Sequence, residues 1–464
     1  MKNSLLKILG LAGLMTLSLA TSNLYALPVV LDTTFGVGGI MTTSMRPDGA
    51  EFRDVVTNNN GVYAGGYSGP RGTNRNINEF IVKYRFDGTL DPSFGVSGII
   101  TNYYGLEDSS VTSVNKYSMA LQADGKLITL SATHHDLFYG SMLARYLPNG
   151  TIDSSFGSAG VVPITETIDV RGLDGTIFHQ GFKPIMVAIQ QDGKILVMAQ
   201  CSCSSLVDQI GLAVIRFKSN GTRDNTFAEY GRFFKIINER YSHTQVASLI
   251  VLNDGGILVH TGSRFVLKLT ASGMLDTSFG DNGISTLDLS GGDFRVSLNV
   301  DSSSNKIYYA YLSNYLITSS EIRYKEVLAR LNMDGAPDIS FGTAGRVFSP
   351  VVTSGTTHSN YFGIVRLLIQ SNKIFLIGGL GLTGEAGPLP FAVMGFDTDG
   401  HVIPLSSTGG PLFTFEPYPV FYPNMNLIES GTVDKKCEMY IVGGADYDYG
   451  LAPISLITKQ NTCG

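Results

Sequence analysis

The chain has 464 residues with 33 basic and 39 acidic side chains, so its formal net charge is −6 at pH 7. A mildly acidic surface repels phosphate backbones and anionic lipid headgroups, and the sequence has no block of like charge, which argues against nucleic-acid partners. After the N-terminal segment no stretch reaches the roughly 18 uninterrupted apolar residues of a membrane helix, so we expect no membrane insertion.

The N-terminal segment, residues 1–26, has the pattern of a secretory signal peptide. Two lysines flank an apolar run, Leu5–Leu19, that ends in small and polar residues, and cleavage after Ala20 or Ala26 fits this pattern. The run is too short for a spanning helix, and no cysteine follows it for lipid attachment. We therefore expect a protein exported to the periplasm or the extracellular medium, in which residues 27–464 form a single domain.

A motif of eight residues, D-x-[ST]-F-[GA]-x-x-G, recurs along the chain. Its six copies begin at Asp32, Asp91, Asp153, Asp224, Asp276 and Asp338. The phenylalanines of successive copies are 52 to 71 residues apart, and a period near sixty indicates a repeat architecture.

Each period predicts four β-strands and no helix. Tight turns such as A-D-G-K and P-N-G separate runs rich in Val, Ile, Leu and Tyr, which is the pattern of β-hairpins. In chain order, central hairpins are expected at NNNGVYAGG, QADGKLITLSA, QQDGKILVMA, LNDGGILVHTG, SSSNKIYYAY, QSNKIFLIGG and DKKCEMYIVGG. Seven such units predict an all-β fold, a seven-bladed β-propeller of four-stranded blades. An open β-solenoid is the main alternative, but its coils are usually shorter and it needs distinct end caps.

The two ends of the chain are offset within the repeat. The first motif copy precedes every central hairpin, and no copy follows the last one. We therefore expect Leu31–Thr43 to pair with Pro453–Asn461, so that the N-terminal strand completes the last blade and closes the propeller. Closure would also leave few exposed strand edges.

The repeat unit combines a DGKI-type hairpin, a strand of the form F-x-V-x-R-Y, the turn D-G-x-L-D and the sequence S-F-G-x-x-G. This unit resembles the delta-60 repeat family of bacterial exported proteins, over nearly the whole chain after residue 26. The resemblance implies a β-propeller and an exported setting, and it implies no activity and no catalytic residues. After Asp399 and Gly400 the chain reads HVIPLSSTGG where a seventh motif is expected, so the outer strand of the sixth blade is left undefined.

Within the motif, the aspartate is expected to accept a hydrogen bond from the backbone N–H two residues on, which forms an Asx turn. The phenylalanine is expected to fill the space between neighbouring blades. The six aspartates, with the acidic run Asp397–Gly400, could instead be calcium ligands. Calcium takes about 6–8 oxygen ligands, however, and no copy supplies the remaining ones. We therefore predict a structural motif and no metal site.

Two further patterns carry weak chemical signals. Residues Gly379–Gly384 match G-x-G-x-x-G, but the EAGPLP that follows cannot begin the helix that a phosphate would need. His134, His135 and Asp136 offer metal ligands or a base, but no further ligand elsewhere in the sequence has a recognisable spacing from them. We expect no cofactor.

The connections differ between the two ends of the blades. The turns between the first and second strands, and between the third and fourth, are short, whereas the connections at the opposite end are long and different in every blade. A rigid scaffold with varied loops is a usual layout for recognition, and tyrosine and arginine are frequent at binding hot spots. The candidate binding residues at this end are Arg71, Arg75, His135, Tyr139, Arg171, His179, Tyr241, Arg323, Tyr324, Tyr361, Tyr447 and Tyr449.

The leading interpretation is an exported, non-enzymatic, monomeric protein whose loop-rich end binds a protein or a glycan. A polysaccharide hydrolase or lyase with carboxylates at the channel mouth is the alternative. No carboxylate pair has a predictable separation, and the absence of tryptophan removes the commonest platform for stacking sugars. A purely structural surface protein is a third class. Two carboxylates converging in a deep pocket at the loop-rich end would favour the enzyme.

The four cysteines all lie after the signal peptide, and an oxidising compartment favours disulfides. We expect local pairs, Cys201 with Cys203 and Cys437 with Cys463. The second pair requires the C-terminal tail to fold back.

Overall fold

The structure is a computed structural model, and all regular structure in the residues it describes is β-strand. It describes residues 30–36, 40–43, 50–68, 78–103, 111–135, 139–171, 177–202, 209–238, 247–260, 264–289, 296–317, 322–349, 360–382, 391–403, 412–415, 426–434, 436, 438–445 and 454–461. These residues contain no helix that is long and apolar enough to cross a membrane. The predicted signal peptide, residues 1–26, lies outside them, and so do Cys203, Cys437 and Cys463. Cleavage and both disulfide pairs therefore stay predictions.

Within the described residues, the strands form seven sheets of four or five strands, which we number in chain order. The first contains β3 (Ala50–Asn58), β4 (Gly61–Ser68), β5 (Asn78–Tyr84) and β6 (Ile99–Tyr103). The second contains β7 (Val111–Leu121), β8 (Leu127–His135), β9 (Tyr139–Tyr146) and β10 (Val161–Ile164). The third contains β13 (Lys183–Ile189), β14 (Ile195–Ser202), β15 (Gln209–Phe217) and β16 (Arg232–Asn238). The fourth contains β17 (Ser248–Val251), β18 (Ile257–His260), β19 (Phe265–Leu269) and β20 (Ile284–Thr286).

The remaining sheets vary this plan. The fifth contains β21 (Ser297–Asp301), β22 (Lys306–Ile317), β23 (Ile322–Asn332) and β24 (Arg346–Phe348). The sixth contains β25 (Asn360–Gln370), β26 (Lys373–Leu382) and β27 (Phe391–Asp397), with β28 (Val402–Ile403) and β29 (Leu412–Phe415) both paired to β27. The seventh contains β30 (Asn426–Val433), β31 (Glu438–Ala445) and β32 (Ile454–Asn461), with β1 (Val30–Leu31) and β2 (Ile40–Thr43) both paired to β32. A separate hairpin, β11 (Thr167–Arg171) and β12 (Ile177–Gly181), lies between the second and third sheets in sequence.

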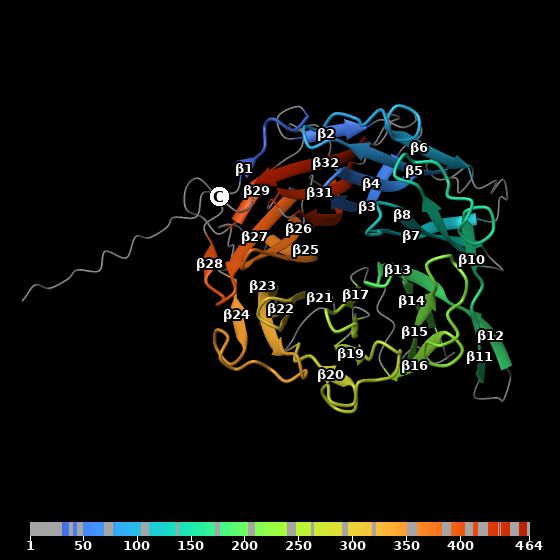
Figure 1. Ribbon diagram of the computed structural model, residues 1–464. Coiled ribbons are helices and arrows are strands. Elements are labelled where there is room, and N and C mark those ends of the chain that lie inside the picture. Colours follow the sequence, from blue (N-terminus) through green and yellow to red (C-terminus); the bar gives the residue numbers. More distant parts are fainter. Residues whose placement is uncertain are drawn as a thin grey trace, which may run out of the picture.

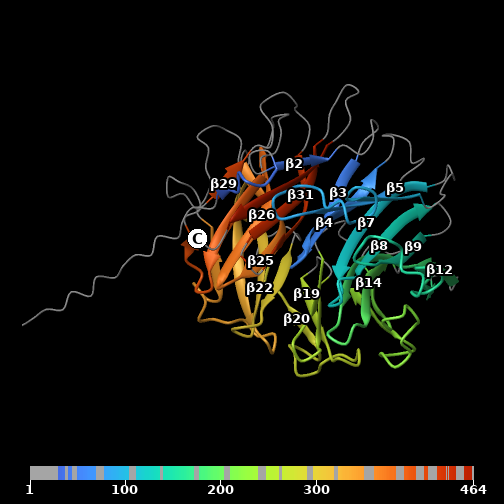
Figure 2. The same ribbon diagram turned by 45° about the horizontal axis from the view of Figure 1, so that its top comes forward.

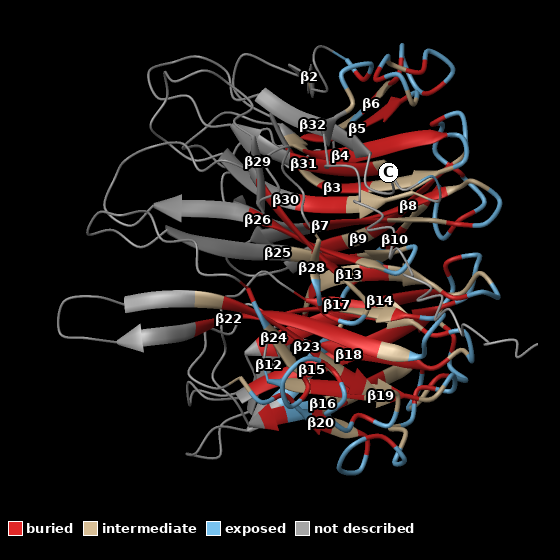
Figure 3. Cartoon of the chain, turned by 90° about the vertical axis from the view of Figure 1, so that its left-hand side faces the viewer, coloured by how far each residue is buried: buried red, intermediate tan, exposed pale blue. Residues whose placement is uncertain are grey.

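The seven sheets stand side by side around a common axis, as Figures 1 and 2 show. The innermost strands contact one another in the order β3, β7, β13, β17, β21, β25 and β30, and β30 also contacts β3. Within each sheet the strands are antiparallel and follow one another outward from this axis. The short turns lie together along one side of the molecule in Figure 3. We call this side the short-turn end and the opposite side the loop end.

The apolar core is divided into layers between neighbouring sheets. One cluster, for example, joins Leu196 and Met198 of the third sheet to Leu249 and Val259 of the fourth. Another joins Phe52 and Val62 of the first sheet to Tyr440 and Val442 of the seventh. Because both faces of a sheet meet a neighbour, the middle strands are buried along most of their length. This explains the near-continuous apolar runs of the central hairpins.

The motif phenylalanines are central to these layers. Phe35, Phe94, Phe156, Phe227, Phe279 and Phe341 are all at most 1 % exposed. The residue after each of the first five phenylalanines donates its N–H to a carbonyl in the third-to-fourth-strand turn of another sheet, for example Gly95 to Asn149 at 2.8 Å. Each motif therefore docks on the turn of the sheet that follows it, which is the role predicted for the phenylalanine.

The N-terminal motif follows the same rule. The N–H of Gly36 donates to the carbonyl of Asp87, in the turn of the first sheet, at 3.0 Å. The Phe35 ring lies 6.5 Å from Tyr84 of the first sheet and 5.9 Å from Tyr440 of the seventh, centroid to centroid. β1 and β2 pair with β32 in antiparallel register, with Leu31 opposite Gln460. The N-terminal strands β1 and β2 therefore lie beside the C-terminal strand β32, at the top of Figure 1.

The outer edge of the sixth sheet is the region that the sequence left undefined. It consists of two short strands, β28 and β29, which pair with successive parts of β27. The turn before β28 still receives the sixth motif copy, because a Cβ added at Gly400 would lie 2.9 Å from the Phe341 ring. The sixth sheet therefore accepts a motif from its neighbour although no copy of its own was found in the sequence.

Candidate functional site

The candidate residues at the loop end fall into two groups. Arg71, Arg75, Tyr241, Tyr447 and Tyr449 lie outside the described residues. The other seven are placed by their backbone, at the ends of strands or in the β11–β12 hairpin: His135, Tyr139, Arg171, His179, Arg323, Tyr324 and Tyr361. His135 ends β8 and Tyr139 begins β9, so they flank one connection of the second sheet. Within the described pairings, candidates are brought together only inside a single sheet. Their role in binding stays a prediction.

The motif aspartates lie at the other end of the sheets, and most have a basic partner eight residues earlier in the third strand. The pairs are Lys83 with Asp91 (2.7 Å), Arg145 with Asp153 (2.9 Å), Arg216 with Asp224 (2.9 Å), Lys268 with Asp276 (2.9 Å) and Arg330 with Asp338 (2.8 Å). These partners were not predicted from the sequence, although the lysine or arginine at this spacing was the available signal.

The hydroxyl and N–H two residues on complete the site of each aspartate. In the second copy, Ser93 donates from Oγ (2.7 Å) and from its N–H (3.1 Å) to Oδ1 of Asp91. Although burial acts to raise it, the pKa of Asp91 is lowered to about 2, because Lys83 and Ser93 donate hydrogen bonds to the charged carboxylate. The predicted Asx turn is therefore present, and these carboxylates act as anchors of the fold.

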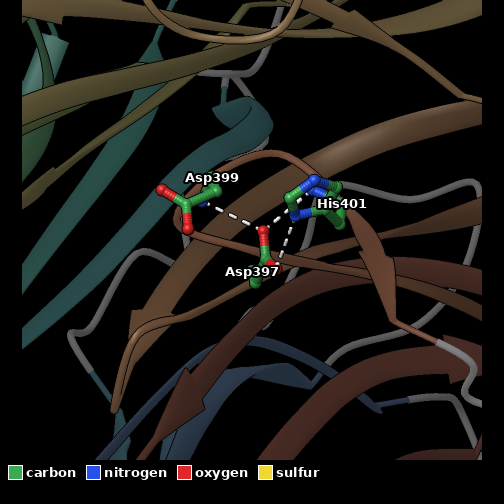
Figure 4. A group of neighbouring side chains, drawn as sticks. All are labelled: Asp397, Asp399 and His401. Carbon is green, nitrogen blue, oxygen red and sulfur yellow. Dashed lines mark hydrogen bonds and ion pairs between the residues drawn. The ribbon is translucent and has the colours of Figure 1, made fainter. Parts of the chain in front are cut away.

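A second cluster of polar groups lies in the turn between β27 and β28. Ligand atoms of Asp397, Asp399 and His401 lie within 4.8 Å of one another (Figure 4). Oδ1 of Asp397 accepts the N–H groups of Asp399 (3.0 Å) and His401 (2.8 Å), and its Oδ2 lies 3.0 Å from Nδ1 of His401. These contacts close the turn, as the Asp87 carboxylate does with Thr89 in the first sheet. We therefore interpret the cluster as a capped turn.

A cavity of about 620 Å³ opens at the short-turn end. It is formed where the first-to-second-strand turns of the first three sheets converge, at residues 57–60, 121–125, 189–191 and 193. Because the innermost strands lead into these turns, the cavity lies beside the common axis of the sheets. Three consecutive repeats thus contribute to one concave surface.

The lining of this cavity is rich in amides. They belong to Asn58, Asn59, Asn60, Gln122, Gln190 and Gln191. Among the described lining residues, Asp124 is the single charged one, and its Oδ2 lies 2.5 Å from Nζ of Lys126. Although burial acts to raise it, the pKa of Asp124 is lowered, because Lys126 donates hydrogen bonds to the carboxylate. The cavity therefore presents neutral donors and acceptors with one compensated charge.

Two glutamines occupy equivalent positions in adjacent turns and differ in their contacts. Gln190 is 7 % exposed, and its Oε1 accepts from Nη1 of Arg216 at 3.4 Å. Gln122 is 9 % exposed, and its Oε1 has no hydrogen-bond partner among the described residues. This cavity was not predicted from the sequence, in which the candidate binding residues all belong to the loop end. The runs of Asn and Gln in the first three turns were the available signal.

One known protein family matches two segments of the chain. A family model described as a β-propeller domain of unknown function, DUF5122, matches residues 122–156 and 190–227. These segments contain β8 and β9 of the second sheet and β14 and β15 of the third, and each segment ends at a motif phenylalanine, Phe156 or Phe227. The matched segments are β-propeller repeats. No curated protein matches the chain in sequence.

The β-propeller repeats have distant counterparts among solved structures. The polysaccharide lyase Uly1 is 10% identical, with a TM-score of 0.46, and the match covers 93% of this chain and 92% of that one. A protein of unknown function from Dyadobacter fermentans is 8% identical, with a TM-score of 0.41 and coverages of 94% and 98%. An α-L-arabinofuranosidase from Fusarium graminearum is 10% identical, with a TM-score of 0.38 and coverages of 74% and 93%. We draw no functional argument from likenesses at this level.

Proposed function

We propose that the protein is an exported, non-catalytic, monomeric binding protein, built on a seven-bladed β-propeller that the N-terminal strand closes. The ligand is a protein or a glycan, held at the loop end. The observation that carries this proposal is that the carboxylates repeated in the chain bind basic side chains and hydroxyls of their own sheet. They hold the scaffold, and the connections that vary are at the opposite end.

Closure by the N-terminal strand is supported by the contacts of Phe35 with both Tyr84 and Tyr440. Burying a phenylalanine contributes about 1.5–3 kcal/mol, and loss of the strand would also expose the edge of β32 to aggregation. Deletion of residues 27–45 should therefore lower the melting temperature sharply and promote oligomers in size-exclusion chromatography. A deletion variant that stays monomeric with an unchanged melting curve would show that the propeller is not closed in this way.

Binding at the loop end is tested on three residues placed at strand ends, Tyr139, Arg171 and Tyr361. Their combined replacement by alanine should weaken the binding of a partner recovered from the native extracellular milieu. Replacement of Lys126 and Lys194, which lie at the short-turn end, is the matched control and should leave that binding unchanged. The reverse result would overturn the assignment.

Catalysis is tested separately. The proposal expects no release of reducing ends and no unsaturated products when the purified protein is incubated with soluble polysaccharides. Either product, if it were lost in the loop-end variant, would replace the proposal with the alternative of a polysaccharide hydrolase or lyase.

A further inference from the structure

The cavity at the short-turn end is independent of the loop end on which the proposed function rests. Its walls are three turns from three consecutive sheets, and their innermost strands contact one another. A volume of about 620 Å³ lies within the roughly 300–1,000 Å³ that small-molecule sites occupy. The cavity is therefore large enough for a ligand of several rings.

The chemistry of the lining selects among ligand classes. Each amide offers an acceptor oxygen and an NH₂ donor, so six amides provide both kinds of group on all three turns. Asp124 is already paired with Lys126, so the cavity carries no strong field of either sign. Such a lining gives little electrostatic stabilisation to a bound anion or cation. Hydroxyl groups, which donate and accept at once, match it.

Gln122 is the lining residue whose buried amide oxygen lacks a hydrogen-bond partner among the described residues. A buried amide oxygen without a partner is destabilising, and a hydrogen-bond donor from a ligand would remove that penalty. The fold does not require glutamine here, because the equivalent turn of the fourth sheet has Leu252, which is 5 % exposed and packs in the apolar core. The unsatisfied polar group thus lies at a position where an apolar side chain is compatible with the turn.

We propose that this cavity is a second binding site, for a neutral polyhydroxylated ligand such as the end of an uncharged glycan. Gln122, whose Oε1 is buried without a partner in the unliganded turn, turns this oxygen into the cavity and accepts a hydrogen bond from a ligand hydroxyl. The exposed amides of Asn59, Asn60 and Gln191 bind further hydroxyls, and the apolar parts of Leu121 and Ile189 contact the sugar ring. The site lies at the opposite end of the sheets from the loops, so it goes beyond the proposed function.

The test uses the full mature chain and a panel of neutral tetrasaccharides, namely cellotetraose, maltotetraose, mannotetraose and chitotetraose, in saturation-transfer NMR and calorimetry. At least one should bind. Gln122→Leu should weaken its binding about three- to tenfold, the effect of losing one net hydrogen bond. Asn59→Ala, an exposed turn variant with little effect on folding, should weaken it as well.

Gln370→Leu is the matched control, because it makes the same chemical change at the turn of the sixth sheet, outside the cavity. It should leave tetrasaccharide binding unchanged, as should the triple variant at the loop end. The inference is overturned if no tetrasaccharide binds, or if Gln122→Leu and Asn59→Ala bind like Gln370→Leu. It is also overturned if an uncharged polar tetrapeptide binds more tightly than the sugars and is lost in the same variants.

Discussion

Ser430 donates a hydrogen bond of 2.7 Å to Oδ1 of Asp54, across 376 positions of sequence. Arg366 donates to the same serine oxygen at 2.8 Å, and the N–H of Met119 donates to Oδ2 of Asp54 at 2.8 Å. These residues lie on the innermost strands β25, β30, β3 and β7. One buried network therefore joins four consecutive sheets, including the seventh, in which the N-terminal strands pair with the C-terminal strand.

Replacement of Asp54 by asparagine tests the strength of this network. Asparagine has one acceptor oxygen instead of two, so either the N–H of Met119 or the hydroxyl of Ser430 loses its partner. Each buried group left unsatisfied costs about 1–3 kcal/mol. Asp54→Asn should lower the free energy of unfolding by this amount in urea denaturation, whereas the exposed Asp399→Asn should change it by less than about 0.5 kcal/mol. Equal effects would show that the network does not stabilise the fold.

The motif aspartates predict loss of stability in acid. The pKa of Asp91 is about 2 in the folded protein and near 3.9 in an unfolded chain, so the stabilisation by its charge is present above pH 4. It is lost as the pH falls from about 4 to about 2, because the unfolded chain then binds the proton first. Urea midpoints between pH 6 and pH 2.5 should fall less steeply for Asp91→Asn than for the native chain. A variant with the native pH slope would contradict this account.

The basic partner of the motif is expected to matter more than a basic residue in an exposed turn. Arg145 lies over the Phe156 ring at 4.6 Å, pairs with Asp153 and donates to the carbonyl of Ser219 in the next sheet. Arg145→Met leaves a buried carboxylate unpaired and should cost about 3–5 kcal/mol. Lys126→Met, which removes the partially exposed pair with Asp124, should cost about 0–1 kcal/mol. Thermal unfolding of the two variants compares them directly.

Phe35 tests whether the N-terminal motif acts like the internal ones. Phe35→Ala and Phe156→Ala each remove a fully buried ring, and both should lower the free energy of unfolding by about 3–5 kcal/mol. Val96→Ala, at a side chain that is 82 % exposed, is the control and should be close to neutral. If Phe35→Ala resembled Val96→Ala in chemical denaturation, the N-terminal copy would not be part of the cooperative core.

The sequence predicted the repeated parts of the fold well because each repeat forms the same turn and buries the same phenylalanine. The D-x-S-F pattern predicted the Asx turn at Asp91 and the buried ring of Phe94, and the chain offset predicted that Leu31 pairs near the C-terminus. The basic partner that lies eight residues before most of these aspartates was not predicted, because the spacing alone does not show that the two side chains meet across the turn. The cavity beside Gln122 was missed because it forms only when turns about 65 residues apart converge in space.

Two glycines of nearly equal backbone conformation separate the effect of motif docking on stability from the backbone strain of the turn. Gly150 and Gly125 have φ of +85° and +82°, so alanine at either position carries a similar strain of about 1–2 kcal/mol. A Cβ at Gly150 would also lie 2.7 Å from the N of Gly95 and 3.1 Å from the Phe94 ring, whereas a Cβ at Gly125 comes no closer than 3.5 Å to Pro148.

Because Gly95 N donates to the carbonyl of Asn149 in this same turn, the added methyl must push the motif off its neighbour. Gly150→Ala should therefore be more destabilising than Gly125→Ala by at least about 1–3 kcal/mol, the usual cost of overpacking. Urea denaturation of both variants provides the comparison. If the two alanines cost the same, the strain of the turn alone would explain both, and the motif would not need its close approach to the next sheet.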